Sequence, residues 1–88
     1  MLRVVSQDEM VDIPYDQTSF SIVNGKEFII KAEWCGTEKI MAVYKSHNMA
    51  KFELNMLRLR YSNLMEAKSD NRAIDSNKFL YQFPPATE

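Results

Sequence analysis

The sequence predicts an α+β fold, in which an antiparallel sheet of hairpin and meander strands carries one long α-helix on one face and a short C-terminal strand. Three observations support this prediction. Residues 46–68 have helical periodicity and contain neither glycine nor proline. Residues 17–45 contain strand-like segments separated by glycine-containing turns. Residues 79–84 include a short apolar segment that stops at a pair of prolines.

We expect a single domain, because 88 residues can bury one modest core. We expect an N-terminal hairpin (1–16), a three-stranded meander (17–45) and the helix (46–68). A mobile loop (69–78), the C-terminal strand (79–84) and a tail (85–88) should follow.

Composition excludes several classes of protein. The net charge is −1 and the basic residues are interleaved with acidic ones, which disfavours nucleic-acid binding. One cysteine allows neither an intrachain disulfide nor a cysteine zinc site, as is typical of a reducing compartment. The sequence shows no secretory leader and no long apolar run, so we expect a cytoplasmic protein that does not enter a membrane.

The N-terminal segment predicts a short hairpin. Leu2 to Ser6 and Met10 to Ile13 are strand-like, and Pro14 should end the second strand because proline has no N–H for the ladder. The acidic residues of this hairpin lack both the spacing and the glycine of a calcium loop, so we expect no metal site there.

The strongest turn signal is the Asn24-Gly25 pair. A three-residue loop with Gly25 in the left-handed region would place Phe20 opposite Phe28, which keeps apolar residues on one face, whereas a two-residue loop would mix the faces. The residues expected to face the helix are Phe20, Ile22, Phe28, Ile30 and Ala32.

The third meander strand is expected from Lys39 to Tyr44, after a turn that begins at Cys35. It is apolar on both faces, which indicates a central or doubly covered position. Strict alternation would place Ile40, Ala42 and Tyr44 on the same face.

Two apolar stripes run along the predicted helix, which Ser46 is suited to cap. The first spans an arc of about 100° and should lie on the sheet; it comprises Ala50, Leu54, Leu57, Tyr61, Leu64 and Met65. The second comprises Met49, Phe52, Met56 and Leu59, and Glu53 and Arg60 lie between the two. A helix that only covers a sheet needs one stripe, so the second requires an explanation.

Two explanations of the second stripe compete. The C-terminal segment from Phe79 to Phe83 could cover it within the same chain. Alternatively, a second protein molecule covers the second stripe, and another copy of this chain is the main candidate. Full burial of each large apolar side chain is worth ~1.5–3 kcal/mol. Burial by the C-terminal segment or by a second molecule is therefore more favourable than exposure to solvent. Methionine is common both in cores and on adaptable binding surfaces, and does not decide between them.

Catalytic and metal-binding patterns are weak. His47 is the only histidine, and no cysteine or acidic residue lies at helix-ligand spacing from it. Nothing in the sequence places this histidine beside Cys35 as a base. Two glycines are too few for a phosphate-binding loop. We therefore expect no enzyme, no metal and no cofactor, and no small-molecule substrate is evident.

The best basic and aromatic group consists of Lys31, Trp34 and Lys39, around the turn that follows Trp34. An indole between two amines could stack on a base and neutralise phosphates. Aromatic residues at strand positions of a small domain more often belong to the core, so a nucleic-acid site is only the alternative prediction.

Several segments resemble a group of small uncharacterised proteins of phages and prophages from Gram-positive bacteria. The likeness lies in Arg3 to Gln7, in Asp12 to Tyr15, in Met41 to Ser46 leading to Ala50, Leu57 and Tyr61, and in Phe83-Pro84. It covers most of the chain through residues of structural character, and no catalytic residue is carried over. The resemblance implies a small accessory protein that acts inside a bacterial cell or in a phage particle.

The sequence therefore predicts a non-catalytic accessory protein that acts through protein–protein interaction, as a homodimer or with another protein. The predicted partner-binding residues are Met49, Phe52, Met56 and Leu59. A nucleic-acid-associated accessory protein is the alternative, with Lys31, Trp34 and Lys39 as its contacts.

Overall fold

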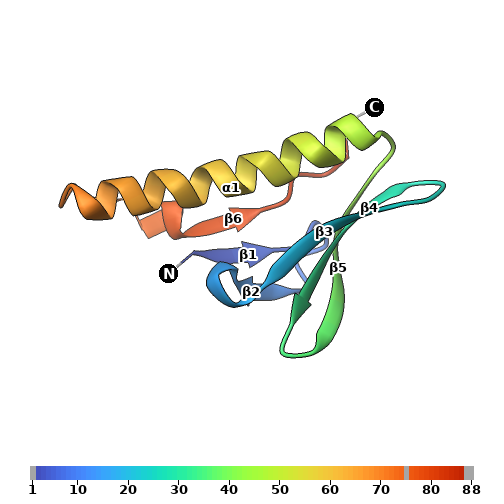
Figure 1. The fold of residues 1–88 in the computed structure, drawn as a ribbon, viewed down its shortest axis with the longest axis horizontal. Helices are drawn as coiled ribbons and strands as arrows, with labels where there is room; N and C mark the ends of the chain where they lie inside the picture. The colour runs from blue at the N-terminus through green and yellow to red at the C-terminus, as the bar shows by residue number, and fades with distance from the viewer. Residues whose placement is uncertain (1, 75, 87–88) are drawn as a thin grey trace.

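The computed structural model of the protein describes residues 2–74 and 76–86. It confirms the α+β fold, with one long helix packed on strands and a short strand at the C-terminal end (Figure 1). Of the expected loop and tail, residues 75, 87 and 88 lie outside the described residues.

The first sheet has the order β2-β1-β6 and joins the two ends of the chain. Its strands are β1 (Arg3–Val5), β2 (Asp12–Pro14) and β6 (Leu80–Gln82). β1 and β2 form the expected antiparallel hairpin, whereas β6 runs parallel to β1. Pro14 is the last residue of β2 rather than the residue after it, which proline tolerates because β2 is an edge strand. A short 3₁₀ turn (Tyr15–Gln17) follows.

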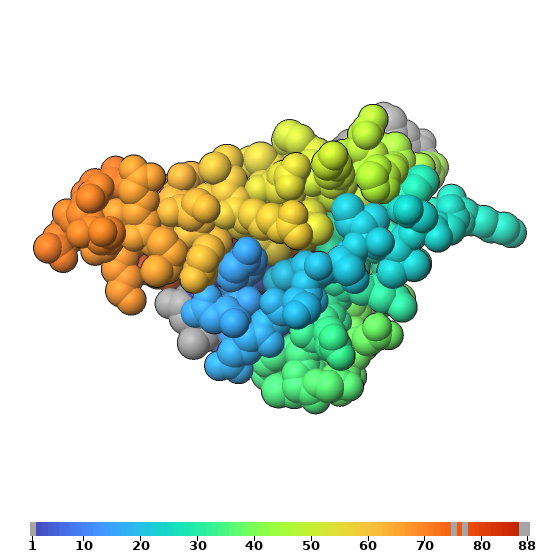
Figure 2. Space-filling view, in the orientation of Figure 1, coloured from blue at the N-terminus to red at the C-terminus, as the bar shows by residue number. Residues whose placement is uncertain are grey.

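The second sheet is an antiparallel meander with the order β3-β4-β5, and its β3–β4 turn protrudes from the molecule (Figure 2). Its strands are β3 (Ser19–Asn24), β4 (Phe28–Trp34) and β5 (Thr37–Tyr44).

The expected pairing of β3 with β4 is wrong. Phe20 lies opposite Ala32 rather than Phe28, and Ile22 lies opposite Ile30. Gly25 does not have a positive φ, so the left-handed loop on which the prediction depended does not form. The shift is an even number of residues, and side chains alternate with a period of two. The expected helix-facing set therefore still faces the core.

β5 begins two residues earlier than expected, because Cys35 and Gly36 alone make the turn. Their φ angles are 53° and 76°, the pair of positive values that a type I′ hairpin turn requires. Met41 is an extra residue in β5 at a β-bulge, since Ile30 pairs with Ala42 and Lys31 pairs with Ile40.

The bulge overturns the expectation that Ile40 shares a face with Ala42 and Tyr44. Ile40 is 54% exposed, whereas Met41 and Ala42 are both buried. The extra residue shifts the alternation by one position, which turns Ile40 to the opposite face.

The helix α1 (His47–Ser69) matches the expected helix within one residue at each end. The Met49 N–H donates to Ser46 Oγ at 3.0 Å, which confirms the N-cap. Most of the first stripe is buried or half-buried, but Met65 is 46% exposed. The C-terminal end of α1 extends beyond the strands (Figure 1), so that part of the stripe has less sheet to cover it. No helix in the described part of the chain has both the length and the apolar character of a membrane span.

One core under α1 is shared by the two sheets. The side chain of Gln7 joins them at their boundary: Val43 N–H donates to Gln7 Oε1 at 2.8 Å, and Gln7 Nε2 donates to the Pro84 carbonyl at 2.9 Å. The amide of Gln7 thus takes the place of a neighbouring strand at the edge of β5. This arrangement fixes the C-terminal segment beside α1.

Candidate interaction surface

The outer stripe of α1, defined as Met49, Phe52, Met56 and Leu59, is the predicted partner-binding surface. Phe52 is 58% exposed, Leu59 51% and Met56 38%. Met49 is half-buried and packs against the core. Three of the four side chains therefore meet solvent in the single chain.

The C-terminal strand does not cover the outer stripe. Tyr81 and Phe83 are buried in the core instead. The Tyr81 hydroxyl donates to Glu53 Oε1 at 3.1 Å, and Arg60 Nη1 donates to the Leu80 carbonyl at 3.1 Å. Glu53 and Arg60 separate the two stripes, so β6 stops at this border. The same-chain explanation is therefore wrong for the three exposed residues.

The border between the stripes is a polar cluster. The guanidinium carbon of Arg60 lies 5.5 Å from the centre of the Tyr81 ring. Burial, and then the nearby negative charge of Glu53, raises the pKa of Tyr81 well above its ordinary value. The phenol therefore stays protonated and continues to donate to Glu53. These contacts hold Glu53 and Arg60 in fixed positions along one side of the outer stripe.

The exposed apolar area is comparable to the largest apolar patch on a typical monomer. Three side chains of about 150–250 Å² each that expose about half of their surface give a patch of roughly 200–400 Å². The largest apolar patch on a typical monomer is about 300–600 Å² and often functional. A stable specific interface buries about 800 Å² on each partner, so the outer stripe can form the centre of an interface but not all of it.

The structure does not bring the three residues of the nucleic-acid alternative together. Lys39 lies opposite Ala32, on the core side of the meander, and Trp34 lies on that same side. Lys31 lies opposite Ile40, on the other side. Residues that are paired in a sheet share a face and neighbours along a strand alternate, so the two lysines occupy opposite faces.

Trp34 and Lys31 are both engaged within the chain. Trp34 is half-buried and packs against the core, and its Nε1 is a buried donor without an acceptor among the described residues. Lys31 Nζ lies 3.7 Å from Glu38 Oε1. The indole therefore packs against the core, and only part of its surface is accessible for stacking.

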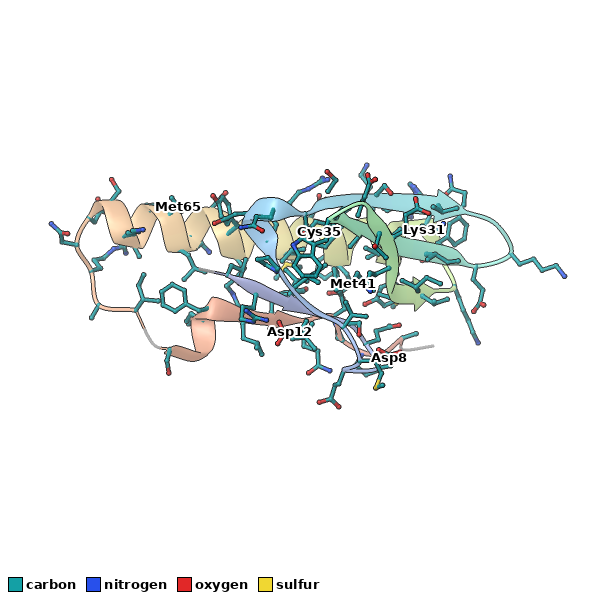
Figure 3. All side chains as sticks on the ribbon, turned by 90° about the horizontal axis from the view of Figure 1, so that it is seen from below. Asp8, Asp12, Lys31, Cys35, Met41 and Met65 are labelled. Atoms are coloured by element: carbon teal, nitrogen blue, oxygen red, sulfur yellow. The ribbon has the colours of Figure 1, made fainter. Side chains whose placement is uncertain are left out.

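Cys35 and His47 lie far apart. Cys35 is exposed in the turn after β4, and Figure 3 shows it there. The His47 ring packs edge-on against Phe28, with ring centres 5.7 Å apart. Phe28 is the first residue of the seven-residue β4, so about 20 Å of strand separates the thiol from the imidazole. They cannot act as a nucleophile and base. The described residues contain no cluster of three metal-ligating side chains.

Two hollows lie under the overhanging end of α1, and the sequence reasoning missed both. One has a volume of about 410 Å³ and is largely polar, with basic side chains from Arg60, Arg72 and Lys78. The other, of about 390 Å³, is largely apolar and lined by side chains such as Leu2, Tyr61, Ile74 and Phe79. Leu64 and Ile74 border both hollows. The excess length of the helix over the strands was the only signal of this overhang in the sequence.

Comparisons with protein-family models, with curated proteins and with solved structures each return no match. The resemblance to phage and prophage proteins therefore stays a prediction.

Proposed function

We propose that the protein is a small, non-catalytic accessory protein of phage or prophage type that acts through protein–protein contact, as a homodimer formed through the outer stripe. The observation that supports this proposal is the exposure of Phe52, Met56 and Leu59 after the C-terminal strand has docked. A second copy has the same apolar surface, and a two-fold pair buries both surfaces at once.

Light scattering coupled to size exclusion, over a range of protein concentrations, tests the proposal. Wild type should have the mass of a dimer, and the double variant Phe52→Glu/Leu59→Glu that of a monomer, because buried carboxylates without partners oppose association. Met65→Glu is the matched control: its side chain is also about half exposed on α1, but it lies away from the outer stripe. The control should remain dimeric, and a monomeric wild type at the highest concentration would refute the homodimer.

The phage or prophage setting, with action inside a bacterial cell, rests on the sequence resemblance alone. Genes for phage replication or particle proteins beside the coding sequence would support this setting. Conserved metabolic genes on both sides would argue against it.

The nucleic-acid alternative has no comparable support, because Lys31 and Trp34 occupy opposite faces of the meander and both have contacts within the chain. Tight, salt-dependent binding to labelled DNA or RNA would restore it.

A further inference from the structure

The outer stripe follows a regular repeat along α1. Its four residues are separated by three, four and three positions, and the series continues with Asn63 and Glu66. This is the spacing of the seam between two helices in a coiled coil. With 23 residues, α1 is about 34 Å long, so the whole repeat fits on one rigid rod.

We propose that α1 packs against α1 of the second copy in antiparallel orientation, an inference that rests on the proposed homodimer. The register places Glu53 beside the partner's Arg60. Met56 then packs beside the partner's Leu59. The two-fold axis repeats each of these contacts, so that one register forms two ion pairs and two apolar contacts.

The charges along the border of the outer stripe select this register. Glu53 and Arg60 are seven positions apart and flank the same side of the repeat. Positions of this kind set the orientation of coiled-coil partners through ion pairs. The bonds within the described chain occupy Oε1 of Glu53 and Nη1 of Arg60. The second carboxylate oxygen and the other guanidinium nitrogens can therefore bind the partner.

Two other arrangements compete with this register, and each has an electrostatic cost. An antiparallel register that pairs the four apolar residues only with one another brings the two Glu53 carboxylates together, which is repulsive. A parallel pair places Glu66 at the seam beside the partner's Glu66, and leaves Glu53 and Arg60 beside the neutral amides of Asn48 and Asn55. The helix dipoles also oppose the parallel arrangement and favour the antiparallel one.

The apolar area of the proposed interface is small. The outer stripe supplies roughly 200–400 Å² of the about 800 Å² that each partner of a stable complex buries. The polar border adds to this area but contributes little apolar surface. An interface this small is typical of weak association. Rising salt should weaken the dimer further, because its orientation depends on ion pairs.

Disulfide cross-linking in a Cys35→Ser background tests the orientation, since Cys35 is an exposed thiol that would otherwise react. Three variants are compared: Phe52→Cys, Asn63→Cys and the combination of both. In the proposed register Phe52 lies beside the partner's Asn63, so only the combined variant should form covalent dimers on mild oxidation. Within one chain these two positions are about 16 Å apart along the helix, too far for a disulfide.

The possible outcomes separate this inference from the proposed function. Covalent dimers from either single variant would show a parallel pair, and would overturn the orientation while leaving the homodimer intact. A dimeric protein that yields no cross-link in any variant would place the interface or the register elsewhere and also overturn it. A monomeric wild type in light scattering would refute both proposals. Circular dichroism checks that each variant is folded, which is expected because both substituted side chains are exposed.

A charge-neutralising variant gives a second test. Glu53→Gln keeps an oxygen that can accept from the Tyr81 hydroxyl but removes the negative charge. Loss of the two ion pairs should weaken dimerisation by about 2- to 30-fold and flatten its salt dependence. Glu27→Gln, in the β3–β4 loop, is the matched control and should change neither property. An unchanged dissociation constant for Glu53→Gln would contradict the proposed register.

Discussion

Replacing the half-buried Gln7 with leucine should destabilise the fold. Gln7 accepts from Val43 N–H at 2.8 Å and donates to the Pro84 carbonyl at 2.9 Å. Each hydrogen bond contributes about 0.5–1.5 kcal/mol net, and a half-buried N–H left without an acceptor costs about 1–3 kcal/mol. The Pro84 carbonyl still accepts a hydrogen bond from the Tyr44 hydroxyl in this variant. The main cost is therefore the Val43 N–H, which loses its acceptor. We expect a loss of about 2–3 kcal/mol, or roughly 10–20 °C in Tm.

Urea unfolding followed by circular dichroism measures this loss. Gln82→Leu is the matched control, because Gln82 has the same side chain but, among the described residues, a single long bond of 3.5 Å to the Ser6 carbonyl. The control should lose less than about 0.5 kcal/mol. A double-mutant cycle between Gln7→Leu and Tyr44→Phe should be non-additive, because both side chains bind the Pro84 carbonyl. Equal losses for Gln7→Leu and Gln82→Leu would refute the view that Gln7 joins the two sheets.

Three further predictions concern the core, the turns and alkaline pH. Leu57→Ala should lower the free energy of unfolding in urea by about 2–5 kcal/mol, because Leu57 is buried. Leu59→Ala should lower that of the monomer by less than about 1 kcal/mol, because Leu59 is exposed. Similar losses for the two variants would contradict the assignment of the two stripes. Gly36→Ala should lower the free energy of unfolding by about 1 kcal/mol, since the φ of Gly36 is 76°. Gly25→Ala should leave it nearly unchanged in the same assay. A larger loss for Gly25→Ala than for Gly36→Ala would contradict the turn geometry. The raised pKa of Tyr81 means that the stability linked to its protonated phenol is complete below its ordinary pKa of 10.0 and is lost as the pH rises above that value. Tyr81→Phe should therefore lose stability less steeply than wild type in unfolding curves above this pH, and equal steepness would show that the phenol does not titrate with unfolding.

The helix was predictable because its signals are local. The N-cap, the two stripes and both ends of α1 depend on residues within a few positions of one another. The N-terminal hairpin and the order of the meander strands were predictable for the same reason. The exposure of the outer stripe was not, because it depends on where the C-terminal strand docks.

The errors of prediction lie where a single residue changes the pairing of a strand. The β3–β4 loop was expected to place Gly25 in the left-handed region, yet the left-handed residues of the meander are Cys35 and Gly36. The bulge at Met41 could not be predicted from the pattern of β5. The residues on both sides of Met41 are apolar, so a shift in the alternation of side chains leaves no signal in the sequence. Each of these choices is made by contacts with another strand, and not by the segment itself.

The sequence by itself determined the class of fold, the long helix with its cap, and the presence of two apolar stripes, since periodicity and capping act over one or two turns of chain. Only the tertiary structure decided which stripe remained exposed. Gln7 meets Pro84 across 77 positions and Tyr81 meets Glu53 across 28, and such pairs are chosen by the packing of the whole core. That packing buries Tyr81 and Phe83 beside the first stripe and leaves Phe52, Met56 and Leu59 of the outer stripe exposed.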